Sequence, residues 1–260
     1  MSKLLNEISR YVRQVLEDAE ISNKAPSYLI VRNAFADLIA SEVISRDEKL
    51  PSERLLHETI GVSRSTLREA LALLEAEGLL HRMDRRGWFV SAARVEYEPA
   101  TLEGFHTFVG RQGHIPRTEV LDQQLVPVNE HTSQIFSAPR RGKLYLIKRR
   151  RYIDERPVVV EHIYLDPRRF PKLLEHNLNG SLSAVLEKTY GVRTTNADVT
   201  MYPSVLSGAV ATQLHVSPST PSLYISRVCR SKDQVVTEYN ENFWHYSAIK
   251  LKLAVVRTRD

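Results

Sequence analysis

The sequence predicts an α+β protein with a helical N-terminal part and a strand-rich C-terminal part. Three observations support this prediction. Between residues 3 and 78, apolar residues recur at the spacing of amphipathic helices. From residue 102 onwards, runs of β-branched and aromatic residues are interrupted by four short helical segments. The segment 92–101 lacks a strong period, so we expect it to be the linker between the two parts.

The composition permits an anionic partner and favours a soluble, cytoplasmic protein. At 260 residues the chain is long enough for two domains. Its 36 Lys and Arg residues outnumber its 31 Asp and Glu residues, which suits a nucleic acid, an acidic membrane surface or a phosphorylated ligand. The single cysteine, Cys229, excludes an internal disulfide and a cysteine-based metal cluster. No apolar run reaches the roughly 18 residues of a membrane span, and the histidines lack metal-binding spacing. We therefore expect no membrane insertion, no metal and no other cofactor.

Four helices and a hairpin are expected in the N-terminal part. The first helix covers residues 3–18 within an extension of residues 1–24, and Ser27 is the expected cap of the second. Ser52 is the expected cap of the third helix, which ends at Gly61, and Gly78 ends the fourth. Two short runs, 79–83 and 87–92, are separated by Asp-Arg-Arg, which predicts a β-hairpin.

The third and fourth helices form a helix-turn-helix, because a short turn that begins with glycine joins them. The second helix of such a pair fits the major groove of DNA. Side chains that can donate to bases and phosphates gather where this helix begins: Ser63, Arg64, Ser65, Thr66 and Arg68. Arg86 and Gly87 lie at the hairpin tip, where glycine lets the backbone approach a duplex closely. Residues 25–91 are therefore predicted to be a winged helix-turn-helix that binds double-stranded DNA. The alternative is a capped surface helix beside solvated arginines.

Strand alternation in the C-terminal part, residues 102–260, predicts an anion-binding surface. It places Arg149 and Arg151 on one face of a strand, where two guanidinium groups suit a phosphate or phosphonate. Two helix starts offer free backbone amides to the same anion. They lie at Ser181 and at Gly104, Phe105 and His106. The alternatives are arginines in solvent and helix starts that are only capped.

The N-terminal part resembles the DNA-binding domain of the GntR family of bacterial transcription regulators. The resemblance covers about residues 26–91 and rests on LPSERLLHETIGVSRSTLREALALLEAEGLL followed by RRGWFV. It implies a homodimer on a short operator palindrome. The implied DNA contacts come from Arg54, Arg64, Ser65, Thr66, Arg68, Arg86 and Gly87. The chain departs from the family pattern in EVISRDEK, residues 42–49, where the family usually has glycines, and in the helix at 3–18.

Residues 96–253 resemble the UTRA effector domain of the HutC subgroup, which has a chorismate-lyase-like antiparallel-sheet fold. The matching segments are LEGFHTFVGRQGHIPRTEVL, RYIDERPVVVE, LNGSLSAVLEKTYGV and EYNENFWHYSAIKL. The resemblance implies that Arg149, Arg151, Ser181 and the amides near Phe105 bind an anionic group. Two glutamates, Glu161 and Glu238, would face the opposite, polar or cationic end. Trp244 would close the pocket where the pattern usually has tyrosine.

Within this subgroup, DRRGWFV, LNGSL and FWHYSAIKL resemble regulators of phosphonate utilisation that sense 2-aminoethylphosphonate. The resemblance implies a ligand-responsive regulator. In this subgroup the commoner arrangement is a repressor that leaves DNA when its effector binds. An amino-sugar phosphate or another carboxylate metabolite would require similar groups, so these effectors stay open. A chorismate-lyase-like enzyme, with Glu161 and Glu238 as an acid/base pair, is the remote alternative. We expect a regulator and no catalytic residues.

Overall fold

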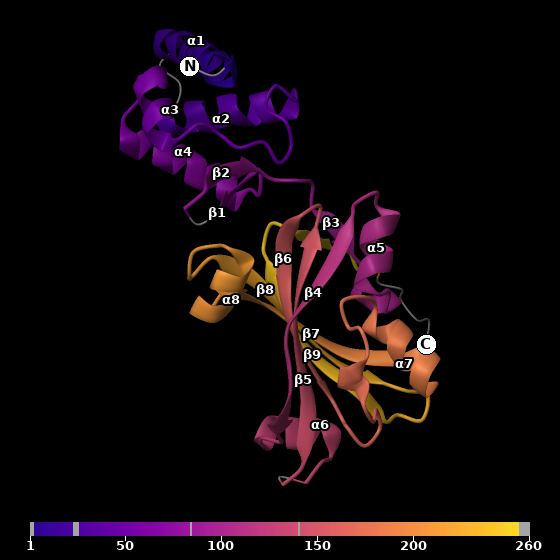
Figure 1. Cartoon of the computed structure of the whole chain (residues 1–260). Helices are drawn as coiled ribbons and strands as arrows, with labels where there is room; N and C mark the ends of the chain where they lie inside the picture. Colours follow the sequence, from indigo (N-terminus) through magenta and orange to yellow (C-terminus); the bar gives the residue numbers. More distant parts are fainter. Residues whose placement is uncertain (1–2, 23–25, 84, 140, 255–260) are drawn as a thin grey trace, which may run out of the picture. The chain divides into compact units, whose positions relative to one another are not determined.

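The computed structural model describes residues 3–22, 26–83, 85–139 and 141–254. They fall into two compact units, Met1–Ala93 and Arg94–Asp260 (Figure 1). The first unit is helical and the second contains the main sheet. The predicted α+β class is therefore confirmed.

The N-terminal unit contains the predicted helices and hairpin. Its elements are α1 (Lys3–Ser22), α2 (Ser27–Ala40), α3 (Glu53–Ile60), α4 (Arg64–Ala76), β1 (Leu80–Met83) and β2 (Gly87–Val90). Ser52 caps α3 by accepting a hydrogen bond from the Leu55 amide, and Gly61 ends the helix in the left-handed conformation, at φ +88°. The prediction for Ser27 was wrong. Ser27 is the first residue of α2, and Pro26 precedes it without a side-chain cap.

One hydrophobic core joins all four helices of the N-terminal unit to the hairpin. Helix α1 contributes Leu5, Ile8 and Val12, which are almost completely buried. The Ser9 hydroxyl also donates to the hydroxyl of Thr59 on α3, at 2.8 Å. The expected extension of residues 1–24 is thus packed into the same unit as the winged helix over its described residues, because one face of α1 is apolar.

The C-terminal unit is built on a six-stranded antiparallel sheet with strand order β4-β5-β6-β9-β8-β7. The strands are β4 (Pro116–Pro127), β5 (Lys143–Ile153), β6 (Arg156–Leu165), β7 (Asn196–Val205), β8 (Pro221–Arg230) and β9 (Val236–His245). Helices α5 (Phe105–Arg111) and α7 (Leu182–Tyr190) lie on one face, and α6 (Glu130–Phe136) and α8 (Gly208–Leu214) lie on the other (Figure 1). The 3-10 turn Leu173–Glu175 lies between β6 and α7.

The expected linker, residues 92–101, differs in the structure. Residues Val95–Tyr97 form β3, which pairs in parallel with β10 (Ile249–Leu251), and Pro99–Thr101 form a 3-10 turn. Val95 and Tyr97 are buried in the core of the C-terminal unit. A three-residue strand is too short to show a period, and its partner lies about 150 residues later in the chain. The C-terminal unit therefore begins at Arg94 and not at residue 102.

Replacing Ile8 with alanine tests whether α1 is part of the core of the N-terminal unit. Ile8 is fully buried, so Ile8→Ala should lower the free energy of unfolding of this unit by about 2–5 kcal/mol. Urea denaturation followed by circular dichroism measures this change. Arg13→Ala, at an exposed position of the same helix, is the control. Equal stability of the two variants would show that α1 does not support the unit.

Candidate functional site

Three arginines gather along a groove between α3 and α4. Arg54, Arg64 and Arg68 line it together with Glu53 and His57. Arg64 Nε donates to His57 Nε2 at 3.1 Å, and Arg68 Nε donates to Glu53 Oε2 at 2.8 Å. The side chains of Arg54 and Arg68 are 66% and 72% exposed. The residues of α3 thus orient these guanidinium groups while most of their N–H donors face solvent.

Glu53 connects α4, the second helix of the helix-turn-helix, to the hairpin. Its carboxylate accepts from Arg68 on α4 and also from Trp88 Nε1 on β2, at 3.0 Å. Burial raises the pKa of Glu53, but the hydrogen bonds from Arg68 and Trp88 outweigh it and hold the pKa below its ordinary value. The carboxylate is therefore charged at neutral pH and holds α4 and the β1–β2 hairpin in a fixed arrangement.

The hydroxyl groups at the start of α4 bond to one another. Ser63 caps α4 by accepting from the Thr66 amide at 3.1 Å, and its hydroxyl lies 2.8 Å from those of Ser65 and Thr66. At the hairpin tip, Gly87 has φ +98°, which a larger residue adopts only with strain. The Arg86 guanidinium lies 5.5 Å from the centre of the Phe89 ring. Asp84, within the predicted tip, lies outside the described residues.

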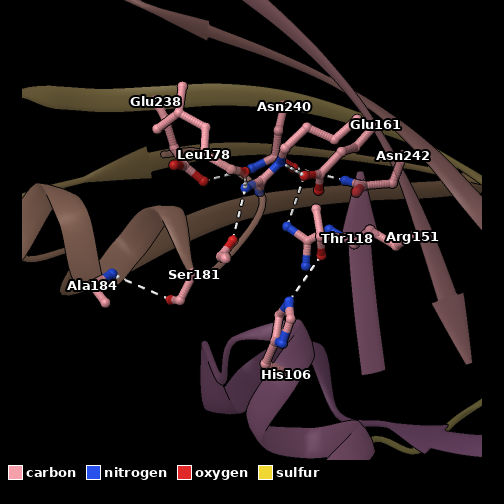
Figure 2. Close-up of polar contacts among 12 residues, drawn as sticks. His106, Thr118, Arg151, Glu161, Leu178, Ser181, Ala184, Glu238, Asn240 and Asn242 are labelled. Atoms are coloured by element: carbon pink, nitrogen blue, oxygen red, sulfur yellow. Dashed lines mark hydrogen bonds and ion pairs between the residues drawn. The ribbon is translucent and has the colours of Figure 1, made fainter. Parts of the chain in front are cut away.

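A pocket in the C-terminal unit brings together all the predicted effector-binding residues. Figure 2 labels His106, Arg151, Glu161, Ser181 and Glu238 among them. They come from the starts of α5 and α7 and from three neighbouring strands, β5, β6 and β9. These residues are Gly104, Phe105, His106, Arg149, Arg151, Glu161, Ser181, Glu238 and Trp244. The pocket therefore lies on the sheet face that α5 and α7 cover.

A buried ion-pair cluster forms the base of the pocket. Arg149 is 1% exposed; its Nε donates to Glu161, and its Nη1 donates to the carbonyl oxygens of Leu178 and Gly180, each at 3.1 Å. Arg151 Nη2 donates to the same Glu161 oxygen at 2.7 Å. The expected position of Glu161 at the opposite end of the pocket was wrong. Glu161 is the direct cross-strand partner of Arg149, so its carboxylate lies against both guanidinium groups.

The cluster is ionised and carries one net positive charge. Burial lowers the pKa of Arg149 to about 10, which leaves the guanidinium charged at neutral pH. Burial raises the pKa of Glu161, but the charges of Arg149 and Arg151 outweigh burial and bring its pKa below the ordinary value. Two cations therefore share one anion in a site that is largely closed to water, and this favours an incoming anion.

The starts of α5 and α7 face this cluster. Ser181 caps α7, its oxygen accepting from the Ala184 amide at 3.3 Å, and Gly104 precedes α5 without a side-chain cap. The Phe105 ring lies 4.9 Å from the Arg151 guanidinium. His106 Nε2 pairs with the Thr118 hydroxyl at 2.8 Å. Burial lowers the pKa of His106, and both pocket arginines lower it further, so its ring adds no charge.

The wall opposite these helices is polar and was only partly predicted. Asn240 donates to Glu238 at 2.8 Å, and Asn242 donates to Asn240 at 2.7 Å (Figure 2). Trp244, expected to close the pocket, is 4% exposed and packs beside Tyr97 in the core. The lining residues that sequence reasoning missed include Tyr97, Arg227, Cys229, Asn240 and Asn242. The alternation that found Arg149 and Arg151 places the last four of these residues on the pocket face of β8 and β9.

Cys229 is a buried thiol that lines the pocket. Burial raises its pKa, so the thiol is protonated and unsuited to act as a nucleophile. Among the described residues, no three His, Cys, Asp or Glu side chains come together to hold a metal ion. None of the helices formed by those residues is long and apolar enough to cross a membrane.

Two family models match this chain. Residues 28–90 match the bacterial regulatory proteins of the gntR family, and residues 111–250 match the UTRA domain. The chain is a GntR-family transcriptional regulator with a UTRA effector domain. A GntR helix-turn-helix binds operator DNA and a UTRA domain binds a small-molecule effector, so the regulator is ligand-responsive.

Relatives and solved structures are similar over most of this regulator. It is 29% identical over 204 residues to the HTH-type transcriptional regulator YihL of Escherichia coli (strain K12), covering 78% of this chain and 86% of YihL. It is 26% identical over 219 residues to the HTH-type transcriptional repressor NagR of Bacillus subtilis (strain 168), covering 84% and 90%. The crystal structure of PhnF from Mycobacterium smegmatis matches with a TM-score of 0.63 at 20% identity, covering 86% of this chain and 99% of that one. The PhnF likeness shows a shared fold.

Removing the carboxylate of Glu161 should destabilise the UTRA unit. Glu161→Gln leaves two arginines beside each other without their anion, so the free energy of unfolding should fall by about 3–5 kcal/mol at pH 7. Because the folded pKa of Glu161 lies below 4.5, this contribution is complete above that pH and is lost as the pH falls through the folded pKa. Urea titrations at several pH values measure both effects. If the difference in free energy of unfolding between wild type and variant does not shrink in acid, Glu161 is not the charged partner of the two arginines.

Removing a groove arginine should weaken DNA binding in a salt-dependent way. Arg64→Ala and Arg68→Ala should each lower affinity for duplex DNA and reduce the slope of log K against log salt by about one. Fluorescence anisotropy over a salt series measures affinity and slope together. Arg13→Ala, exposed on α1, is the matched control. If the slope of log K against log salt is unchanged in both groove variants, α4 is not part of the DNA interface.

Proposed function

We propose that this regulator is a homodimeric repressor that leaves its operator when a small phosphonate or phosphate metabolite binds in the UTRA pocket. The best candidate for the effector is 2-aminoethylphosphonate. The observation that carries the proposal is the buried cluster of Arg149, Arg151 and Glu161, which retains one positive charge beside two helix starts. A protein that controls a bacterial operator acts where the chromosome lies, so we place it in the cytoplasm.

The cluster suits a tetrahedral oxyanion better than a neutral ligand. Arginine recognises phosphate-like groups through parallel N–H donors. Glu161 holds the guanidinium groups of Arg149 and Arg151 in position before the ligand binds. Arg151 keeps a buried Nε–H that has no hydrogen-bond partner. The Ser181 hydroxyl and the first amides of α7 and α5 supply further donors around the same space. An effector oxyanion would satisfy these donors.

The polar wall on β9 supports a cationic group at the other end of the effector. Glu238 accepts from Asn240 and has no ion pair among the interactions of the described residues. An ammonium group beside Glu238 would gain a charge-assisted hydrogen bond. Because Glu161 is already paired to arginine, Glu238 alone would bind the cationic end, whereas the resemblance implied both glutamates. A zwitterion such as 2-aminoethylphosphonate matches one cationic end and one anionic end.

An amino-sugar phosphate is the second candidate effector. The carboxamides of Asn240 and Asn242 line the pocket and are suited to the hydroxyl groups of a sugar. A relative from Escherichia coli (strain K12), 25% identical over 227 residues, is named as a probable repressor of a fructoselysine utilization operon. An enzymatic role for Glu161 is disfavoured, because a base must be free to accept a proton and Glu161 is held by two arginines.

The repressor assignment rests on relatives and on linkage. NagR and the fructoselysine relative are both named repressors. If the effector binds better to a form that fits the operator poorly, then DNA must weaken effector binding by the same factor. Symmetry of a dimer would present two recognition helices to two half-sites, so a small change in their spacing would suffice for release.

Calorimetry with a matched pair of variants tests the proposed effector. Wild type should bind 2-aminoethylphosphonate, and Arg151→Gln should weaken binding by roughly tenfold or more, because a charge-assisted hydrogen bond is lost. Lys148→Gln is the control, since Lys148 lies on the same strand but pairs with Asp122 on the opposite face. Binding of an amino-sugar phosphate without binding of 2-aminoethylphosphonate would favour the second candidate. If the two substitutions weaken binding equally, the arginine cluster does not bind the effector.

A further inference from the structure

A third arginine lines the UTRA pocket and is not paired with an anion. Arg227 lies on β8, and its Nη1 donates to the Tyr97 hydroxyl at 3.2 Å. Its Nε is buried and has no hydrogen-bond partner. Among the ion pairs of the described residues, none includes Arg227. A partly buried guanidinium with an unused donor in a ligand pocket is suited to bind an acidic group.

A pocket carboxylate on the neighbouring strand also lacks an ion pair among the described residues. Glu238 lies on β9 opposite Cys229, while Arg227 lies opposite Asn240, so the two charges are diagonal neighbours across adjacent strands. Glu238 accepts from Asn240 and from the Cys229 thiol. The charge of Glu238 acts on Arg227, yet no ion pair joins the two side chains. A ligand with an anion and a cation on neighbouring atoms would bind both groups at once.

We propose that the effector carries a carboxylate beside its ammonium group, so that it is an α-amino acid with a phosphonate or phosphate on its side chain. Its carboxylate binds Arg227 and its ammonium group binds Glu238. Its phosphonate or phosphate binds the cluster of Arg149, Arg151 and Glu161. This inference rests on the proposed function of the same pocket and adds a second acidic group to the effector.

The local pairing of charges around Arg227 favours this effector. Glu103 is paired with Arg111 at 3.1 Å, so the charges left in the interior are three arginines and two glutamates. An ammonium group beside Glu238 would neutralise the one anion that acts on Arg227 from the pocket wall. Without a carboxylate, the partly buried Arg227 would then lack a compensating charge, which is unfavourable. A carboxylate on the same carbon as the ammonium group supplies that charge beside Arg227.

Two pairs of compounds differ only by this carboxylate. They are 2-amino-3-phosphonopropionate with 2-aminoethylphosphonate, and O-phosphoserine with O-phosphoethanolamine. Calorimetry with the full-length wild type should give at least about tenfold tighter binding for the carboxylated member of a pair. In Arg227→Gln the ratio of the two affinities within each pair should fall to about one. Arg230→Gln should keep the ratio, because Arg230 lies on the same strand outside the pocket and pairs with Asp198.

Each result decides between the two proposals. If the members without the carboxylate bind as tightly as those with it, or if the preference survives in Arg227→Gln, the carboxylate proposal is wrong while the phosphonate site stands. If no compound of either pair binds to wild type, the carboxylate proposal and 2-aminoethylphosphonate both fall, and an amino-sugar phosphate is the candidate effector that remains. Thermal unfolding of Arg227→Gln checks that the variant is folded. Arg227→Lys, which keeps the charge but loses the planar fork, should recover part of the preference.

Discussion

The buried pair of Arg149 and Glu161 is the interaction on which the effector site depends. It joins β5 to β6 in the interior of the sheet, and the same guanidinium holds the carbonyl oxygens of Leu178 and Gly180. That loop leads directly into Ser181 and the start of α7. One arginine therefore fixes the helix whose amides face the pocket, while Glu161 fixes Arg151. Burying such charges costs free energy, and the pocket gains a rigid set of donors in return.

In each of the two functional sites, a carboxylate holds arginine side chains in place. In the winged helix, Glu53 holds Arg68 and the indole of Trp88, so the recognition helix and the hairpin keep one arrangement. In the UTRA unit, Glu161 holds two arginines in a similar way. In both sites a carboxylate removes part of the rotational freedom of long cationic side chains before the anion arrives. This lowers the entropy lost on binding DNA or effector.

Much of the fold followed from the sequence, because amphipathic helices and long alternating strands leave clear periods. The short strands β3 and β10 could not be predicted, since three residues show no period and their pairing depends on the rest of the fold. The position of Glu161 depends on a bulge. A regular ladder from the turn at Asp154 and Glu155 would place Val160 opposite Arg149, but an extra residue, Val158, brings Glu161 there instead. Arg227 was missed although alternation on β8 was sufficient to place it on the pocket face.

We propose that the acidic group of the effector binds between the arginine cluster and the start of α7. The most direct measurement is a crystal structure of the 260-residue chain with bound 2-aminoethylphosphonate or 2-amino-3-phosphonopropionate. We expect phosphonate oxygens within hydrogen-bond distance of Arg151 and Ser181, with the pair of Arg149 and Glu161 intact. A phosphonate bound elsewhere in the UTRA unit, or a Glu161 side chain turned away from both arginines to contact the ligand, would contradict it.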